Sequence, residues 1–157
     1  MKRFQQCLFL ILACTVVTVR ASGAAVCSVS STGTAFGVFD TLSGSNKDVI
    51  GTISVTCTGN IGDAVNYVIA LSPGGGSFAS RTMQAGAPQL SYNLYSDGAH
   101  TSVWGDGTGG TSTVSDSYSL PASSSTRQYT VYGRIPSGQS GAVAGNYADT
   151  MVITLTY

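Results

Sequence analysis

The chain has 157 residues, only 9% of them charged, and a formal net charge of zero at pH 7. Three of its seven cations lie within the first 20 residues, so four cations against seven aspartates leave residues 25–157 with a net charge of about −3. Without a basic patch to neutralise phosphates, the chain does not have the composition of a nucleic-acid-binding protein or of a ligand for anionic membranes.

The first residues are typical of a secretory signal peptide. Two basic residues follow the first methionine, an apolar run covers residues 7–19, and small residues follow at 21–25. We expect residues 1–24 to be the signal, cleaved after Ala24 or Ala25, and residues 25–157 to form one domain. The apolar run is too short for a permanent anchor, so we expect no transmembrane segment after cleavage. A lipoprotein signal ending at Cys14 is the competing interpretation.

Two cysteines, Cys27 and Cys57, remain after cleavage. In an oxidising compartment, an even pair in a small domain favours a disulfide. Closing a loop of about thirty residues would stabilise the fold by about 3–4 kcal/mol. A metal-binding or reactive pair would need further ligands, but the chain has a single histidine and no Cys-x-x-Cys motif.

After the signal, apolar residues alternate with period two, which predicts half-buried strands rather than helices. The clearest runs, in chain order, cover residues 49–58, 65–72, 89–96, 127–135 and 147–157. All four prolines fall between these runs, in Gly- and Ser-rich connections. About seven short strands at this spacing predict an all-β fold, an immunoglobulin-like β-sandwich.

The last run is the longest, and it reaches the final residue of the sequence. Met151, Ile153, Leu155 and Tyr157 share one face of it. A sandwich of this type normally has one more strand beyond this position, and an edge left unpaired must be covered. We therefore expect an incomplete sandwich with a groove beside these four residues, filled by another segment or by a partner's strand. An ordinary closed sandwich is the alternative.

No arrangement of residues indicates an enzyme. The lone His100 lies in a turn-like stretch and is expected to be a solvated loop residue, because a triad needs a nucleophile and a carboxylate nearby. The sequence GQSGA at 138–142 lacks the second glycine of a nucleophile elbow. WGDGTGGT at 104–111 has one aspartate, too few for calcium. We expect no catalytic residues, no cofactor and no metal.

Three aromatic residues are candidate surface contacts. Tyr95 and Tyr132 are out of phase with the apolar faces of their runs, and exposed tyrosine is common at interfaces. Trp104 could stack on a sugar, although a sole tryptophan beside a loop more often packs over the open end of a sandwich. These residues favour a binding or assembly role without naming the partner.

Six blocks of sequence follow one another along the chain: CSVSSTGTAFGVFD, GTISVTCTG, SFASRTM with Arg81, LSYNLYSD, VWGDGTGGT and GNYADTMVITLTY. In these blocks and in their order, the chain resembles the spore coat protein U domain family, which includes subunits of archaic chaperone–usher pili. The resemblance implies an incomplete immunoglobulin-like fold with a Cys27–Cys57 disulfide. It also implies that a periplasmic chaperone first fills the missing strand. An outer-membrane usher then exports the subunit, and a neighbour's N-terminal extension replaces the chaperone strand.

One departure from the family bears on the role of the chain. Cleavage after Ala24 or Ala25 leaves one or two residues ahead of Cys27, so the chain could accept a strand but not donate one; cleavage near Cys14 would leave TVVTVRASGAAV as a possible donor. We expect a secreted structural subunit of a surface fibre or spore-coat-like layer, exported through the periplasm to the cell surface. The alternative is a self-contained carbohydrate- or surface-binding sandwich; a secreted hydrolase is a third, weaker hypothesis.

Overall fold

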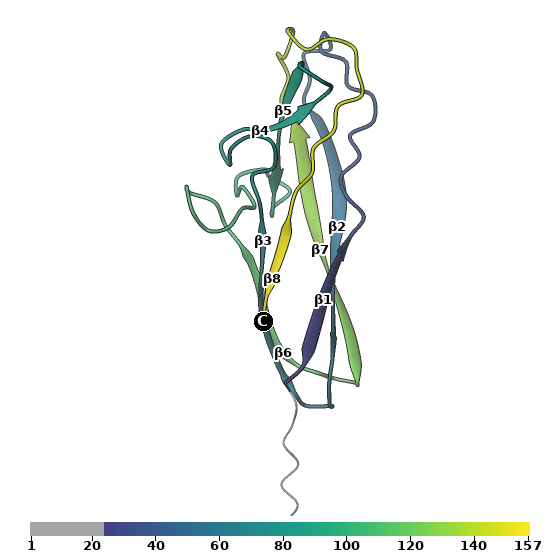
Figure 1. The fold of residues 1–157 in the computed structure, drawn as a ribbon, viewed down its shortest axis with the longest axis vertical. Coiled ribbons are helices and arrows are strands. Elements are labelled where there is room, and N and C mark those ends of the chain that lie inside the picture. Colours follow the sequence, from purple (N-terminus) through teal and green to yellow (C-terminus); the bar gives the residue numbers. More distant parts are fainter. Residues whose placement is uncertain (1–23) are drawn as a thin grey trace, which may run out of the picture.

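The computed structural model describes residues 24–157, which form eight β-strands in two sheets and no helix (Figure 1). The alternative lipoprotein signal, and the expected signal peptide of residues 1–24 except for Ala24, lie outside the described part of the chain. Among residues 24–157 there is no helix of the length and hydropathy needed to cross a bilayer.

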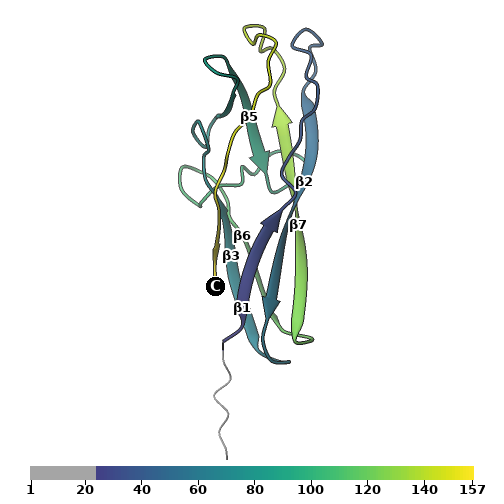
Figure 2. The ribbon, with the colours of Figure 1, turned by 45° about the vertical axis from the view of Figure 1, so that its right-hand side comes forward.

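The two sheets pack face to face, and all their strand pairs are antiparallel (Figure 2). The larger sheet contains, in order across it, β1 (Val26–Ser31), β2 (Lys47–Thr58), β7 (Ser124–Ile135), β5 (Gln89–Tyr95) and β4 (Arg81–Gln84). The smaller sheet contains β6 (Val114–Ser119), β3 (Ala64–Leu71) and β8 (Ile153–Thr156). The predicted all-β, immunoglobulin-like sandwich is confirmed.

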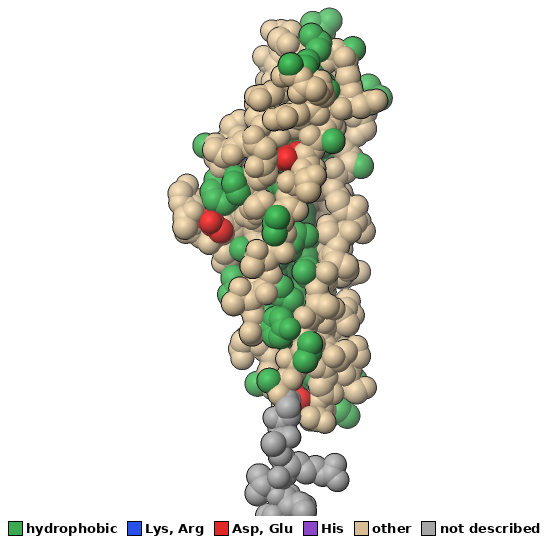
Figure 3. Space-filling model, in the orientation of Figure 1, with side chains coloured by type: hydrophobic (Ala, Val, Ile, Leu, Met, Phe, Trp, Pro, Cys, Tyr) green, Lys and Arg blue, Asp and Glu red, His purple; other side chains and the backbone are tan. Residues whose placement is uncertain are grey.

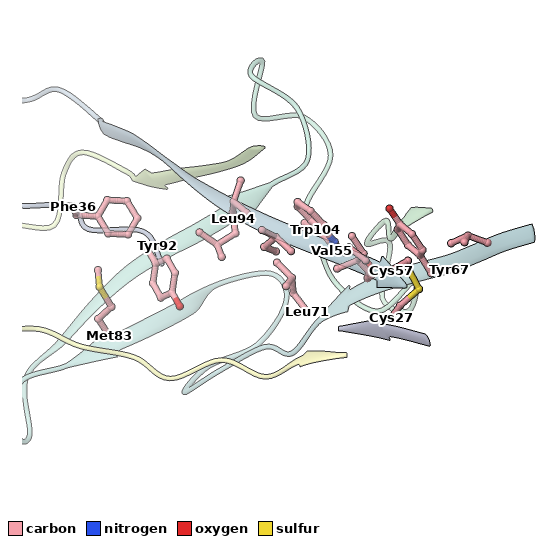
Figure 4. Close-up of a cluster of buried hydrophobic side chains, with 14 of the residues drawn as sticks. Cys27, Phe36, Val55, Cys57, Tyr67, Leu71, Met83, Tyr92, Leu94 and Trp104 are labelled. Carbon is pink, nitrogen blue, oxygen red and sulfur yellow. Dashed lines mark hydrogen bonds between the residues drawn. A yellow bond between two sulfur atoms is a disulfide. The ribbon is translucent and has the colours of Figure 1, made fainter. Parts of the chain in front are cut away.

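The core lies between the sheets and follows from the period-two pattern. On β2, β3 and β5 the alternate apolar side chains predicted to share a face are all buried: Ile53, Val55, Cys57, Val65, Tyr67, Ile69, Leu71, Leu90, Tyr92 and Leu94. Figure 4 shows this core extending from Phe36, Met83 and Tyr92 at one end to the cysteine pair at the other. Alternation along a strand is sufficient to produce this arrangement, because successive side chains point to opposite faces.

The disulfide joins Cys27 of β1 to Cys57 of β2, as predicted. The two residues are direct partners in the antiparallel ladder, with Cα atoms 4.0 Å apart. Since β1 pairs with no other strand of the described chain, the bond fixes an edge strand to its single neighbour.

The last strand is shorter than the sequence predicts. The alternating run 147–157 becomes a strand only at β8, because the chain passes from one sheet to the other within it: Ala148 exchanges two backbone hydrogen bonds with Gln84 of β4, whereas β8 pairs with β3. The prediction of one long final strand was therefore wrong. β1, β4 and β6 were missing from the predicted runs, and all three are short strands of six, four and six residues.

Candidate functional site

The two sheets meet without pairing along one side of the sandwich. β1 is an edge of the larger sheet and β8 an edge of the smaller one, and they lie side by side in both ribbon views (Figures 1 and 2). Cα atoms of β1 and β8 come within 8 Å of each other, yet no ladder joins the two strands. A strand inserted between them needs about 9.5 Å, so they must separate slightly at their closest approach.

An apolar stripe is visible along this side of the molecule (Figure 3). We call the region "the groove", bounded by β1 and residues 32–39 on one side and by residues 147–156 on the other. One hollow in it is a cavity of about 760 Å³ lined by 34–39 and 142–149, with Met83, Leu90 and Tyr92 also in its wall. A smaller hollow of about 40 Å³ is lined by Leu71, Leu94, Val131, Met151 and Ile153, among others. The core is thus reachable from outside along this side.

Three of the four predicted groove residues lie together. Met151, Ile153 and Leu155 are half-buried and packed against the core, whereas Val152, Thr154 and Thr156 between them are exposed. Tyr157 follows the last residue of β8 and is 59% exposed, so it does not share the burial of the other three. Met151, Ile153 and Leu155 therefore lie at the rim of the groove with their side chains on the same face, as the alternation in the sequence indicates.

The opposite rim also has free backbone. Thr32 donates its N–H to the carbonyl of Thr52, but none of residues 34–39 takes part in a backbone–backbone hydrogen bond within the described chain. The segment is held by its side chains: Phe36 is buried and packs edge-on against Tyr92 at a ring-centroid distance of 5.7 Å. Unpaired N–H and C=O groups along a rim are what an added strand binds.

The side of the smaller sheet away from the groove is interlocked instead. Tyr129 of β7 donates its hydroxyl to Asp116 Oδ2 at 2.6 Å and also bonds the hydroxyl of Tyr67. Arg127 donates to the same carboxylate oxygen at 3.0 Å and lies over the ring of Tyr118. The hydrogen bond from Tyr129 lowers the pKa of Asp116, while burial raises the pKa of Tyr129. This network ties β6 and β3 to β7, so the sandwich is closed here and open at the groove.

Trp104 is not a surface residue. Its side chain is 0% exposed, and its Nε1 donates to the carbonyl of Ile69 at 3.0 Å. The proposal of Trp104 as a surface contact was wrong, and the packing alternative is what the structure shows. Tyr95 and Tyr132 are cross-strand partners and partly exposed, away from the groove.

His100 is also placed differently from the prediction. Its side chain is only 8% exposed and lies edge-on to Tyr95 and Tyr132, at centroid distances of 5.1 and 6.2 Å. The turn bends the loop back onto the sheet because the Asp97 carboxylate accepts hydrogen bonds from the backbone N–H groups of Thr101 and Ser102. The expectation of a solvated loop residue was wrong: the ring packs on the sheet, and its Nε2 lies 3.9 Å from Asp48 Oδ1. Within residues 24–157, no three His, Cys, Asp or Glu side chains gather as a metal site would require.

With this geometry established, comparison with known proteins gives the family. The family model of the Spore Coat Protein U domain matches residues 13–154, so the chain belongs to the spore coat protein U domain family. No curated protein has a significantly similar sequence.

The fold is shared with solved structures. Among them is a chain of the crystal structure of the CsuC–CsuE chaperone–tip adhesion subunit pre-assembly complex from archaic chaperone–usher Csu pili of Acinetobacter baumannii. The TM-score is 0.58 and the sequence identity 18%, over 85% of this chain and 40% of that one. This chain therefore spans less than half the length of its structural relative, and at this identity the likeness shows the fold.

Proposed function

We propose that the chain is a structural, non-enzymatic subunit of a chaperone–usher surface fibre or a related coat layer. It accepts a β-strand from another polypeptide in the groove. The observation that carries the proposal is a pair of unpaired backbone rims, β8 and residues 34–39, on either side of an open apolar core. Such an arrangement binds an extended segment through main-chain hydrogen bonds and through pockets for alternate side chains.

The proposed partners follow from the family and from the structural relative. A periplasmic chaperone fills the groove first, an outer-membrane usher exports the subunit, and other pilus or coat subunits supply the final strand. The structural relative belongs to a chaperone–tip adhesion subunit pre-assembly complex of archaic pili, which supports a chaperone as the first partner. Residues 1–24 act as the signal that directs the chain to the periplasm and then to the cell surface. If cleavage follows Ala24 or Ala25, the chain accepts a strand without donating one.

The energetics of such a complex come from the groove floor. Each leucine-sized side chain that an incoming strand buries fully contributes about 1.5–3 kcal/mol, and the ladder bonds fix its register. None of the residues that line the smaller hollow is charged. The one acidic residue lining the larger cavity, Asp149, already accepts three hydrogen bonds. The groove therefore favours an uncharged strand with alternating apolar residues.

A pair of neighbouring substitutions tests this function. Ile153→Asp places a charge on the groove face of β8, and Thr154→Asp places the same charge one residue away on the exposed face. In the native bacterium, fibres sheared from the cell surface should lose the Ile153→Asp subunit and retain the Thr154→Asp subunit. Equal display of the two variants would contradict strand acceptance at the groove. A self-contained binding module would be indicated if wild-type chain were displayed or secreted as a free monomer.

A further inference from the structure

A buried arginine lies behind the groove rim. Arg81 of β4 is 0% exposed, and its guanidinium donates to three acceptors. Nε and Nη2 donate to the Ser72 carbonyl at 3.2 and 3.0 Å, Nη2 to the Trp104 carbonyl at 2.7 Å, and Nη1 to Asn93 Oδ1. Burial lowers the pKa of Arg81. All the hydrogen bonds of the guanidinium go to neutral acceptors, and two of them go to the Ser72 carbonyl.

The hydrogen bonds from Arg81 to the Ser72 carbonyl change how Ser72 pairs with the last strand. The register of β3 with β8 places Leu71 opposite Ile153, so Ser72 is next in line opposite Val152. Ser72 donates its N–H to the Val152 carbonyl at 2.9 Å, but its own carbonyl faces Arg81. The N–H of Val152 instead donates to Ser72 Oγ at 2.9 Å. The serine hydroxyl therefore replaces a ladder carbonyl that the arginine has withdrawn.

The pairing of Ser72 with Val152 sets the phase of the strand that follows. In an antiparallel ladder, hydrogen-bonded pairs alternate with non-bonded pairs. Because Val152 bonds to Ser72, Thr154 and Thr156 also direct their backbone groups to β3. Ile153 and Leu155 then direct their N–H and C=O groups away from β3, into the groove. These residues also place their side chains toward the core.

The start of the same segment has a second anchor. Asp149 accepts hydrogen bonds from the N–H of Gly75 at 3.0 Å, from its neighbour Thr150, and from the Tyr92 hydroxyl at 2.7 Å. Residues 149 and 152 are thus both tied to the loop 72–75, which Arg81 holds in turn. The four residues that cross between the sheets are fixed at each end.

We infer that Arg81 and Ser72 are positioning residues for strand acceptance: together they fix the phase in which Met151, Ile153 and Leu155 offer their backbone groups to an incoming strand. The inference rests on the proposed function. The buried arginine thus has a role beyond filling the core. Its hydrogen bonds occupy the Ser72 carbonyl, so the Ser72 hydroxyl accepts the hydrogen bond from the N–H of Val152 instead.

Amide hydrogen exchange measured residue by residue by NMR on the oxidised protein tests the phase directly. In the wild type, the amides of Val152, Thr154 and Thr156 should exchange more slowly than those of Met151, Ile153 and Leu155. In Ser72→Ala, Val152 loses its acceptor, and its exchange should accelerate by about fivefold to tenfold. Ser72→Thr, which keeps the hydroxyl, should restore protection. Equal protection of the two sets of amides, or unchanged exchange of Val152 in Ser72→Ala, would overturn the inference.

Two further variants separate positioning from general loss of stability. Thr82→Ala removes another hydroxyl bond to the same loop, from Thr82 Oγ1 to the Gly75 carbonyl, and should leave the exchange of Val152 unchanged. Arg81→Lys cannot reproduce the bonds to both Ser72 and Trp104 and should accelerate exchange at Val152. If Arg81→Lys fails to fold, Ser72→Ala carries the test alone.

Partner capture separates this inference from the proposed function. Tagged wild type and Ser72→Ala are purified from the native periplasm, and the co-purified polypeptide is quantified per folded chain. Reduced capture by Ser72→Ala, with capture by Ser72→Thr intact, is the expected result. Equal capture by all three would overturn the positioning role while leaving strand acceptance in place. No capture by any of them, with the exchange pattern as expected, would refute the function while the positioning of β8 stands.

Discussion

The indole of Trp104 is held in the core by both packing and a hydrogen bond. Its nitrogen satisfies the Ile69 carbonyl on β3 inside the core, and the ring has no exposed surface. Trp104→Phe would leave that carbonyl without its donor and create a void, at a cost of about 2 kcal/mol. Denaturant unfolding should show this loss in the midpoint. An unchanged midpoint would contradict the packing role of the indole.

Arg81 and His100 show what the sequence could not reveal at this scale. A cation in a short run after a Gly- and Ser-rich stretch is usually solvated, and only the positions of Ser72, Asn93 and Trp104 in space make Arg81 a buried donor. His100 is in a turn, as its sequence indicates, but the direction in which the loop folds back is a tertiary property. By contrast, the cysteine pairing was predictable, since two cysteines within residues 25–157 allow one intramolecular bond.

Among the elements, β1 is the edge strand that a disulfide joins to its neighbour. It pairs with β2 alone and forms one wall of the groove. Replacing both Cys27 and Cys57 by serine should lower the unfolding free energy by about 3–4 kcal/mol, because the loop between them is no longer closed. Denaturant unfolding of the oxidised wild type and of the double variant measures the difference. A loss below about 1 kcal/mol would mean that the ladder alone holds β1.

The strands themselves were predictable to different degrees. β2, β3, β5 and β7 have one face in the core and one in solvent, so alternation identified them with nearly correct bounds. The predicted final strand was too long, because the alternation in residues 147–152 is the same whether the chain continues in one sheet or crosses to the other. The bonds of Asp149 and Ser72 decide that it crosses. The prediction of a groove came from the same strand, whereas the second rim at residues 34–39 has no period-two signal.

For the whole molecule, acid is the expected destabilising condition. The hydrogen bond from Tyr129 lowers the pKa of Asp116, and that from Arg134 lowers the pKa of Asp48. A carboxylate whose pKa is lowered by folding stabilises the folded state fully when the pH is above the pKa of the unfolded state, about 3.9. That contribution is lost as the pH falls through the pKa of the folded state. The unfolding free energy should therefore decrease below about pH 4. Asp116→Asn should flatten the decrease, and a flat wild-type profile in denaturant titrations would contradict this account.

The whole molecule is a sandwich with one side locked by the tyrosine–aspartate network and the other left open. We expect another polypeptide to complete this open side. Native mass spectrometry of the tagged chain, purified from the periplasm of its own bacterium, is the test. We expect a one-to-one complex with a second, chaperone-like polypeptide, and the intact mass of the subunit gives the signal cleavage position. A folded, disulfide-closed monomer with no bound polypeptide would refute completion by a partner and favour a self-contained binding module.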